Sequence, residues 1–279
     1  MIRHDDGMFA GAAGGEIYWQ SWLPAAPVGV VVIAHGLAEH SGRYAHVGQR
    51  LAGAGHAVYA LDHHGHGRST GTRANISRMA HVRVDLHELI SRAVVRHHGL
   101  PVFLLGHSLG GLIALDYVTS SGATLLTGLL LSGAAVDPSV GSPVQRVAAR
   151  VLGSLTPNLG VMALDSTAVS RDPHVVARYD ADSLIYHGKV RARTGAEALS
   201  TVRRLMSRLG SIRMPVLVMH GTQDRLASPD GAKLVADNVT SDDVTLKLYP
   251  GLYHEIFNEP EKDDVLDDVA KWLERRCSQ

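Results

Sequence analysis

Short apolar runs alternate along the chain with stretches in which apolar residues recur at helical spacing. The spacing of three to four residues is clear from Val82 to Val94 and again from Val265 to Leu273. Strands rich in valine, isoleucine and leucine that alternate with helices predict a mostly parallel sheet flanked by helices, so the α/β class is expected. The predicted strands are Val28–Ala34, Ala57–Leu61, Val102–Leu105, Leu126–Leu131, Pro215–Met219 and Val244–Tyr249.

The segment from Ala134 to Gly210 interrupts this alternation. It contains no convincing strand, whereas apolar residues recur at helical spacing in Val144–Leu152 and again from Ala198 to Leu209. Turn residues mark its two ends. We therefore predict a helical cap, or lid, at residues 134–210, inserted into an α/β core made of residues 1–133 and 211–279.

Composition excludes several classes of protein. The 279 residues include 27 Lys+Arg and 27 Asp+Glu, so the net charge is zero and no global field attracts nucleic acid, which is not an expected partner. A single cysteine, Cys277, excludes an intramolecular disulfide and a thiolate metal cluster. The start of the chain lacks a signal-peptide pattern, and no run approaches the ~18 apolar residues of a membrane span, so a cytoplasmic location is expected.

The sharpest motif is Gly106-His107-Ser108-Leu109-Gly110, which lies between a predicted strand and the helix-like stretch Leu112–Val118. A nucleophilic serine needs a tight turn in which glycines let the strand and the helix approach each other. The strand–turn–helix context therefore predicts that Ser108 is a nucleophile. The alternative is a plain glycine turn in which the serine caps the helix.

A serine hydroxyl needs a base, and the base needs an acid to orient it. Asp224 and His254 each follow a predicted strand directly, in the order Ser, Asp, His that this nucleophile turn uses. We predict a triad of Ser108, His254 and Asp224. Taken singly, Asp224 could form an Asx turn and His254 could lie on a surface loop. The rival acids, none of which follows a strand so directly, are Asp165, Asp172, Asp180, Asp182 and Asp230.

Acyl transfer also needs two donors for the developing oxyanion. The predicted donors are the backbone N–H groups of Leu109 and Leu37, and His35 is expected to be a hydrogen-bonding residue beneath the site. The histidines from His63 to His66 are too close together to converge on one metal ion, and no nucleotide-binding motif occurs. The sequence therefore predicts neither a metal nor a cofactor.

Together these motifs resemble the α/β-hydrolases of the monoacylglycerol lipase family, over nearly the whole chain. The resemblance depends on the segment from His35 to Tyr44, on Leu61–Ser69, on the Ser108 turn, and on Asp224 and His254. The first segment, of the form H-G-x-x-E-H-x-x-R-Y, is the most specific. One departure is His64, where the family usually has arginine, and similarity is weakest in the cap.

The resemblance implies hydrolysis of a monoacylglycerol, a small lipid, to glycerol and a fatty acid beneath a mobile helical cap. It also implies that Glu39, Arg43 and Tyr179 hold the glycerol hydroxyls. Read from the residues alone, Glu39 and Arg43 could instead form a surface ion pair four residues apart, and Tyr179 could pack the cap on the core. Apolar residues that face outward from the cap would allow peripheral contact with a membrane. The oligomeric state is not predicted.

Other functions remain open at this stage. A carboxylesterase or thioesterase could use the same three residues on another acyl group, and an acyltransferase or perhydrolase would need an acceptor that outcompetes water. A lipid-binding protein without activity is disfavoured because it has no chemical need for Ser108, Asp224 and His254. Dehalogenases and epoxide hydrolases of this fold are disfavoured because they use an aspartate nucleophile.

Overall fold

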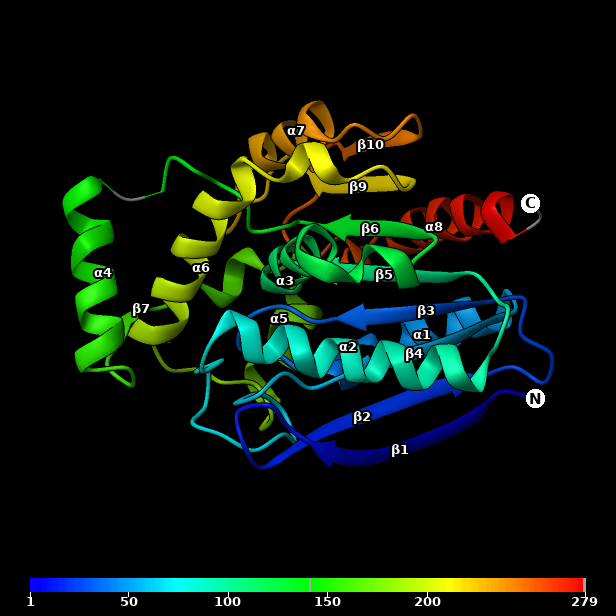
Figure 1. The fold of residues 1–279 in the computed structure, drawn as a ribbon, viewed down its shortest axis with the longest axis horizontal. Coiled ribbons are helices and arrows are strands. Elements are labelled where there is room, and N and C mark those ends of the chain that lie inside the picture. Colours follow the sequence, from blue (N-terminus) through cyan, green and yellow to red (C-terminus); the bar gives the residue numbers. More distant parts are fainter. Residues whose placement is uncertain (141, 278–279) are drawn as a thin grey trace.

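A twisted sheet of eight strands runs through the molecule (Figure 1). The computed structural model describes residues 1–140 and 142–277. The strand order is β1-β2-β4-β3-β5-β6-β9-β10, with the six strands from β4 to β10 parallel and the first two antiparallel. This confirms the predicted α/β class. The strands are β1 (Arg3–Ala10), β2 (Glu16–Leu23), β3 (Gly29–Ala34), β4 (His56–Leu61), β5 (Val102–His107), β6 (Gly128–Ser132), β9 (Val216–Gly221) and β10 (Val244–Tyr249).

The sequence pattern missed the antiparallel pair β1 and β2. β1 lies at the edge of the sheet, where it pairs with β2 and exposes most of its side chains, including Asp6. β2 mixes aromatic and polar residues, with Gln20 and Ser21 buried beside Trp22. Neither strand therefore forms the continuous apolar run that identified the parallel strands.

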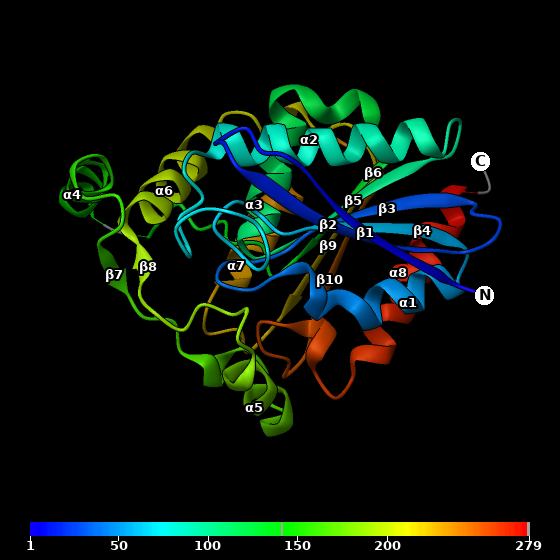
Figure 2. The same ribbon diagram turned by 90° about the horizontal axis from the view of Figure 1, so that it is seen from below.

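The sheet separates two apolar cores. Side chains alternate along each strand, so Val30 and Val32 of β3 face one core while Val31 and Ile33 face the other. Figure 2 shows the helices on the two faces. The first core packs against α2 (Met79–Arg96), α3 (Leu109–Tyr117) and α7 (Pro229–Asn238), and the second against α1 (Ala45–Gly53) and α8 (Lys262–Cys277).

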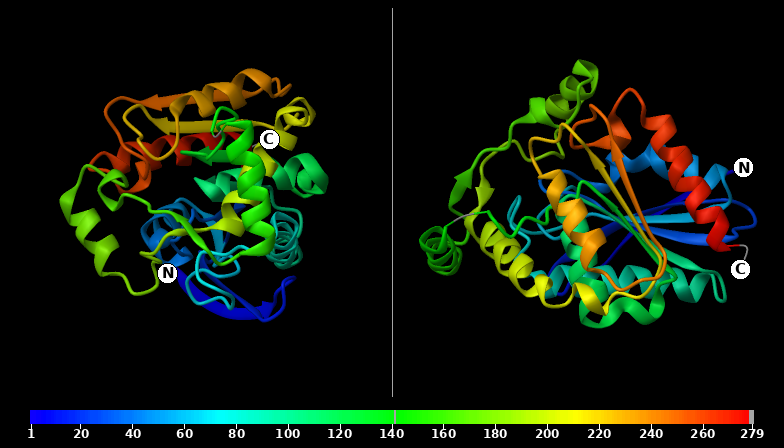
Figure 3. Two further views of the ribbon diagram at one scale, coloured as in Figure 1. Left: turned by 90° about the vertical axis from the view of Figure 1, so that its left-hand side faces the viewer. Right: turned by 90° about the horizontal axis from the view of Figure 1, so that it is seen from above.

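The insertion between β6 and β9 contains α4 (Pro143–Leu155), α5 (Pro173–Ala181) and α6 (Ala192–Met206). It lies beyond the carboxyl ends of the parallel strands, at the opposite end of the molecule from both termini (Figures 1 and 3). We refer to residues 134–210 as the cap, although its separation from the core as a unit stays a prediction.

The expectation of a cap without strands was wrong. A short antiparallel pair, β7 (Gly160–Met162) and β8 (Val190–Arg191), joins the two halves of the cap. Runs of three and two residues are too short to produce a sequence period. Among the helices of the described residues, none has both the length and the apolar character needed to cross a bilayer.

Candidate active site

Ser108 occupies the turn between β5 and α3 in a backbone conformation that is rare for a residue with a side chain. Its φ of 53° and ψ of −119° lie outside the usual regions, and such strain costs about 1–3 kcal/mol. The turn is held by the N–H of Ser108, which donates to the Ser132 carbonyl at 2.9 Å. Ser108 occupies the N-cap position, but its side chain makes no capping hydrogen bond to any described residue. The helix-capping interpretation is therefore wrong for this turn.

The glycines around Ser108 are required by close backbone contacts. A Cβ atom on Gly110 would lie 2.0 Å from the Ala34 carbonyl oxygen, and one on Gly106 would lie 2.5 Å from the carbonyl oxygen of Gly110. Real Cβ atoms do not approach other atoms so closely. The G-x-S-x-G motif thus lets α3 begin directly against β3 and β5.

His254 and Asp224 come together from the loops that follow β10 and β9. Nδ1 of His254 lies 2.7 Å from Oδ2 of Asp224. The other carboxylate oxygen, Oδ1, accepts backbone N–H groups of Leu226 and Ala227 at 2.8 and 2.9 Å. Asp224 therefore forms an Asx-type turn with one oxygen and faces His254 with the other, the position that a triad acid requires.

The rival acids have other partners or positions. Asp165 and Asp172 accept hydrogen bonds at the beginnings of cap helices, and Asp182 lies 2.9 Å from Nε2 of His40. Asp230 pairs with Lys233 on α7. Among the acids considered from the sequence, Asp224 is the one that the described residues place against His254.

Electrostatics favour an ionised Asp224 and a basic His254. Burial raises the pKa of Asp224, but hydrogen bonds from His220 and His254 outweigh it and bring the pKa well below its ordinary value. Burial lowers the pKa of His254, yet the hydrogen bond and charge of Asp224 leave it above its usual 6.5. His254 is only 6% exposed, and its ring lies tilted against that of His107, the neighbour of Ser108, at 4.8 Å between ring centroids. The surface-loop interpretation of His254 is wrong.

His220 is a site residue that the sequence pattern did not identify. This fully buried residue near the end of β9 places its Nε2 2.9 Å from Oδ2 of Asp224, the same oxygen that faces His254. The available signal was a histidine that follows four apolar residues of a strand and precedes Asp224 by four positions. The apolar run predicts the strand, but it does not indicate that its end presents a histidine to Asp224.

The two predicted oxyanion donors line the same cavity as Ser108. Leu109 is the first residue of α3, where N–H groups have no acceptor within the helix, and Leu37 lies in a turn with Ala38 at φ 67°. His35 is fully buried beneath this turn. Its Nδ1 donates to the Gly36 carbonyl at 2.7 Å and its Nε2 accepts the N–H of His63 at 2.9 Å, which is the bracing arrangement expected from the sequence.

Glu39, Arg43 and Glu255 form a buried group that we call the Arg43 cluster. Nη1 of Arg43 lies 2.8 Å from Oε2 of Glu39 and 2.5 Å from Oε1 of Glu255, and Nη2 lies 2.7 Å from Oε2 of Glu255. The three side chains are only 4–9% exposed. The alternative of a surface ion pair is therefore wrong, because the partners are buried and a second carboxylate joins them.

The Arg43 cluster is tied to the predicted oxyanion loop. Oε1 of Glu39 accepts the N–H of Gly36 at 2.6 Å and the hydroxyl of Tyr44 at 2.8 Å. Burial, opposed by Arg43 and supported by Glu255, raises the pKa of Glu39. Burial also raises the pKa of Glu255, but Arg43 outweighs it and lowers that pKa overall.

Tyr179 of α5 packs inside the cap and also borders the cavity. It packs with Val169 and Ile185 in a small apolar cluster of the cap, and its ring lies 4.8 Å from the Arg43 guanidinium. It also lines the cavity, as does Glu39. Arg43, in contrast, is not among the described residues that line the cavity, because its donors turn toward the two carboxylates.

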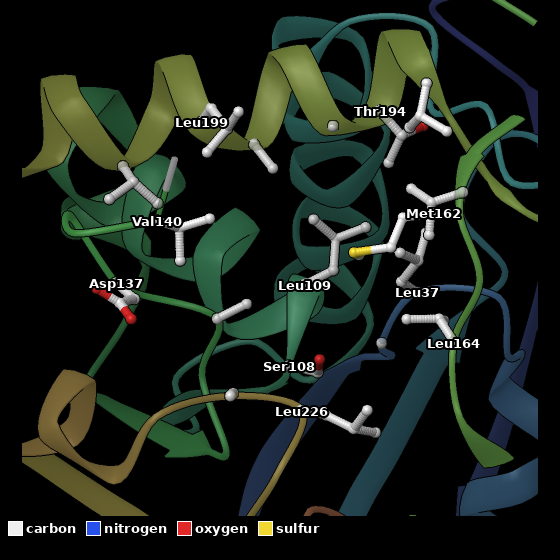
Figure 4. A pocket seen from close by; sticks show the side chains of 18 of the residues that line it. Leu37, Ser108, Leu109, Asp137, Val140, Met162, Leu164, Thr194, Leu199 and Leu226 are labelled. Atoms are coloured by element: carbon white, nitrogen blue, oxygen red, sulfur yellow. The ribbon is translucent and has the colours of Figure 1, made fainter. Parts of the chain in front are cut away.

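A cavity of about 520 Å³ extends from Ser108 into the cap (Figure 4). This volume is in the range of small-molecule sites. Polar groups gather beside Ser108 and His254, whereas the walls formed by the cap are mostly apolar. The described side chains include no group of three or more histidine, cysteine, aspartate or glutamate residues arranged to hold a metal ion. The apolar lining includes Leu37, Leu109, Val140, Met162, Leu164, Leu199 and Leu226.

Comparison with known proteins identifies relatives along the whole chain. The family model described as serine aminopeptidase, S33 matches residues 25–261. A monoacylglycerol lipase of Mycolicibacterium smegmatis is 46% identical over 95% of both chains. A monoglyceride lipase of Homo sapiens is 34% identical over 96% of this chain and 89% of that protein.

Solved structures agree with these relatives. The crystal structure of a monoacylglycerol lipase of Paleococcus ferrophilus superposes with a TM-score of 0.83 at 29% identity, and the match covers 99% of each chain. The fold around the site is thus the α/β-hydrolase fold, with a mostly parallel sheet flanked by helices.

Proposed function

The chain belongs to the monoacylglycerol lipase family of α/β-hydrolases, and on this premise we propose that it cleaves the ester bond of monoacylglycerols to give glycerol and a free fatty acid. The observation that carries the proposal is the cavity, which joins an apolar wall to polar groups beside a strained serine. An acyl chain fits the apolar part, and a hydroxylated alcohol fits the polar part.

In the proposed mechanism, Nε2 of His254 takes the proton of Ser108 while the serine oxygen attacks the ester carbonyl. Asp224 holds His254 through Nδ1 and stabilises the imidazolium that forms. The N–H groups of Leu37 and Leu109 bind the oxyanion. Collapse of the tetrahedral intermediate breaks the bond to glycerol, which leaves with the proton from His254.

Deacylation repeats these steps with water. His254 removes a proton from the water that attacks the acyl-enzyme, and returns it to the oxygen of Ser108 when the acid is released. No cofactor takes part in these steps. We assign Glu39 and Tyr179, which line the cavity, to the glycerol end. Arg43 supports this end by holding the carboxylate of Glu39 in place.

We also propose that the cap contacts lipid aggregates through α4. Val144, Val147, Val151 and Leu155 are 48–78% exposed on this helix, which lies at the outer end of the molecule in Figure 1. An amphipathic helix with such an apolar face binds the interface of a membrane without spanning it. The same helix lines the cavity through Leu152, so this contact would place the cavity close to the lipid.

Fatty-acid release from 1-octanoylglycerol tests the proposed function. The wild type is compared with Ser108→Ala, and dioctanoylglycerol and p-nitrophenyl octanoate serve as alternative substrates. We expect preference for the monoacylglycerol and a loss of at least about 10³-fold in the variant. Equal or better cleavage of the other esters would favour a general esterase, and release that is unaffected by Ser108→Ala would refute the nucleophile.

A further inference from the structure

The polar end of the cavity holds more negative charge than positive. We propose that Glu255 is a specificity-determining residue, whose carboxylate makes the enzyme select esters of neutral or cationic alcohols against esters of anionic alcohols such as glycerol phosphate. This inference rests on the proposed function and deepens it, because it names the alcohols that the same site accepts.

The carboxylates of the Arg43 cluster lie beside the reacting groups. Glu255 follows His254 directly, and both residues line the cavity. Glu39 and Ser108 approach Gly36 together, since a Cβ atom on Gly36 would lie 2.8 Å from Oε1 of Glu39 and 3.1 Å from Cβ of Ser108. An alcohol that leaves from the ester carbonyl at Ser108 therefore comes close to both carboxylates.

The one guanidinium in the cluster is already engaged. Arg43 donates to both oxygens of Glu255 and to Oε2 of Glu39, so its charge is shared between two carboxylates. Among the described residues that line the cavity there is no lysine or arginine, and the acidic residues are Glu39, Glu255 and Asp137. His254 must be neutral when it accepts the proton of Ser108. A phosphate group would thus meet negative charge without a free cation.

Burial makes this imbalance effective. Glu39, Arg43 and Glu255 are nearly inaccessible to solvent, and salt screens buried charges much less than exposed ones. An anionic ligand that approaches these carboxylates in a poorly solvated site is repelled by them. Many binding sites reject alternative substrates by such repulsion. A cationic alcohol is favoured for the same reason.

Substitution of Glu255 tests the selection between charged alcohols without disturbing the predicted oxyanion loop. Glu39 holds the predicted oxyanion loop through Gly36, so its substitution would disturb catalysis for every ester. Glu255 instead bonds Arg43 and Nδ2 of Asn258. Glu255→Gln keeps the size of the side chain and leaves Arg43 balanced by Glu39.

The test uses three esters with one acyl group: 1-octanoylglycerol, 1-octanoylglycerol 3-phosphate and octanoylcholine. Each is assayed below its critical micelle concentration with the full chain. Relative to the neutral ester, we expect Glu255→Gln to raise kcat/KM for the phosphate about 10-fold and to lower kcat/KM for the choline ester several-fold. A steric or merely structural role would not change the two charged esters in opposite directions.

The matched control is Glu88→Gln, which makes the same change in net charge at the exposed end of an ion pair with Arg92 on α2. It should leave both ratios unchanged. A second arm needs no variant: octyl phosphate should inhibit the wild type at least 10-fold more weakly than octyltrimethylammonium, which keeps the test decisive if Glu255→Gln does not fold.

The outcomes separate the inference from the proposed function. If the wild type does not cleave 1-octanoylglycerol, the proposed function is wrong. If it cleaves this ester but the ratios stay fixed in a folded Glu255→Gln, or both inhibitors bind equally well, the role of Glu255 is refuted.

Discussion

Nε2 of His220 and Nδ1 of His254 approach the same oxygen, Oδ2 of Asp224, at 2.9 and 2.7 Å. An ionised carboxylate only accepts hydrogen bonds, so each histidine donates one. With two backbone N–H groups on Oδ1, the carboxylate is held by four donors. His220 is thus a positioning residue that acts on His254 through Asp224.

Removal of the His220 donor should reduce turnover. We expect His220→Leu to lower kcat about 10–100-fold with little change in KM, because the alcohol and acyl sites stay intact. The acid limb of the pH profile should move to higher pH, since a carboxylate with fewer donors attracts the proton of His254 more strongly. His220→Gln, which keeps an N–H donor, should recover most of the activity. Equal losses in a folded Leu and Gln variant would contradict the donor role.

The pH dependence of kcat/KM should reflect His254. Because the pKa of His254 lies above 6.5, and only the neutral imidazole accepts the proton of Ser108, activity should fall as the pH drops through a midpoint above 6.5. Initial rates on a soluble octanoyl ester between pH 5 and 9 measure the midpoint. A midpoint well below 6.5 would show that Asp224 does not support His254 as proposed.

Gly110→Ala should strongly destabilise the protein. The added Cβ would meet the Ala34 carbonyl at 2.0 Å, a backbone contact that no side-chain rotation relieves. We expect a loss of about 3 kcal/mol or more in the free energy of unfolding. Gly53→Ala at the end of α1 is the control, since nothing lies within 4 Å of its Cβ, and its effect should stay within about 1 kcal/mol. Similar urea midpoints for the two variants would refute the packing argument.

Substitution of exposed valines on α4 by aspartate should weaken binding to lipid. The double variant Val147→Asp, Val151→Asp places two carboxylates on the exposed apolar face, and we expect at least a 10-fold loss of binding to phosphatidylcholine vesicles in a sedimentation assay. Activity on a soluble ester should change little. Val84→Asp, at a similarly exposed valine on α2, is the control. Unchanged vesicle binding of the double variant would show that α4 is not the contact surface.

Buried histidines should make the fold sensitive to acid. Burial is the main cause that lowers the pKa of His63 and His107 to about 3 and that of His66 to about 4. Below pH 6.5 these histidines are protonated in the unfolded chain but stay neutral in the folded chain. Their contribution to the free energy of unfolding is therefore fully present above pH 6.5 and is lost as the pH falls toward 4 and then 3.

Urea unfolding at pH 7.5, 6.5, 5.5 and 4.5 measures this loss. Between its pKa in the unfolded chain and its lower pKa in the folded chain, each such histidine reduces the free energy of unfolding by about 1.4 kcal/mol for each unit that the pH falls. The free energy of unfolding should therefore decrease by several kcal/mol between pH 6.5 and 4.5. A free energy that stays constant over this interval would mean that these histidines are charged in the folded protein.

The sequence by itself determined the parallel sheet and the local chemistry of the Ser108 turn. Strands that are buried on both faces have continuous apolar sequences. At Gly106 and Gly110 a Cβ atom would lie 2.0–2.5 Å from backbone atoms, so only glycine fits these two positions. Asp224 and His254 could be placed because the ends of parallel strands meet at one edge of the sheet.

Tertiary structure alone decided the surroundings of these residues. The edge strands β1 and β2 and the short pair β7 and β8 lack a period that identifies them. His220 and His254 meet at one oxygen of Asp224 because β9 and β10 lie side by side, and Glu255 reaches Arg43 across 212 positions of the chain. Such contacts depend on how helices, strands and loops pack together. The local sequence around one charged residue does not indicate which distant charged residue it will contact.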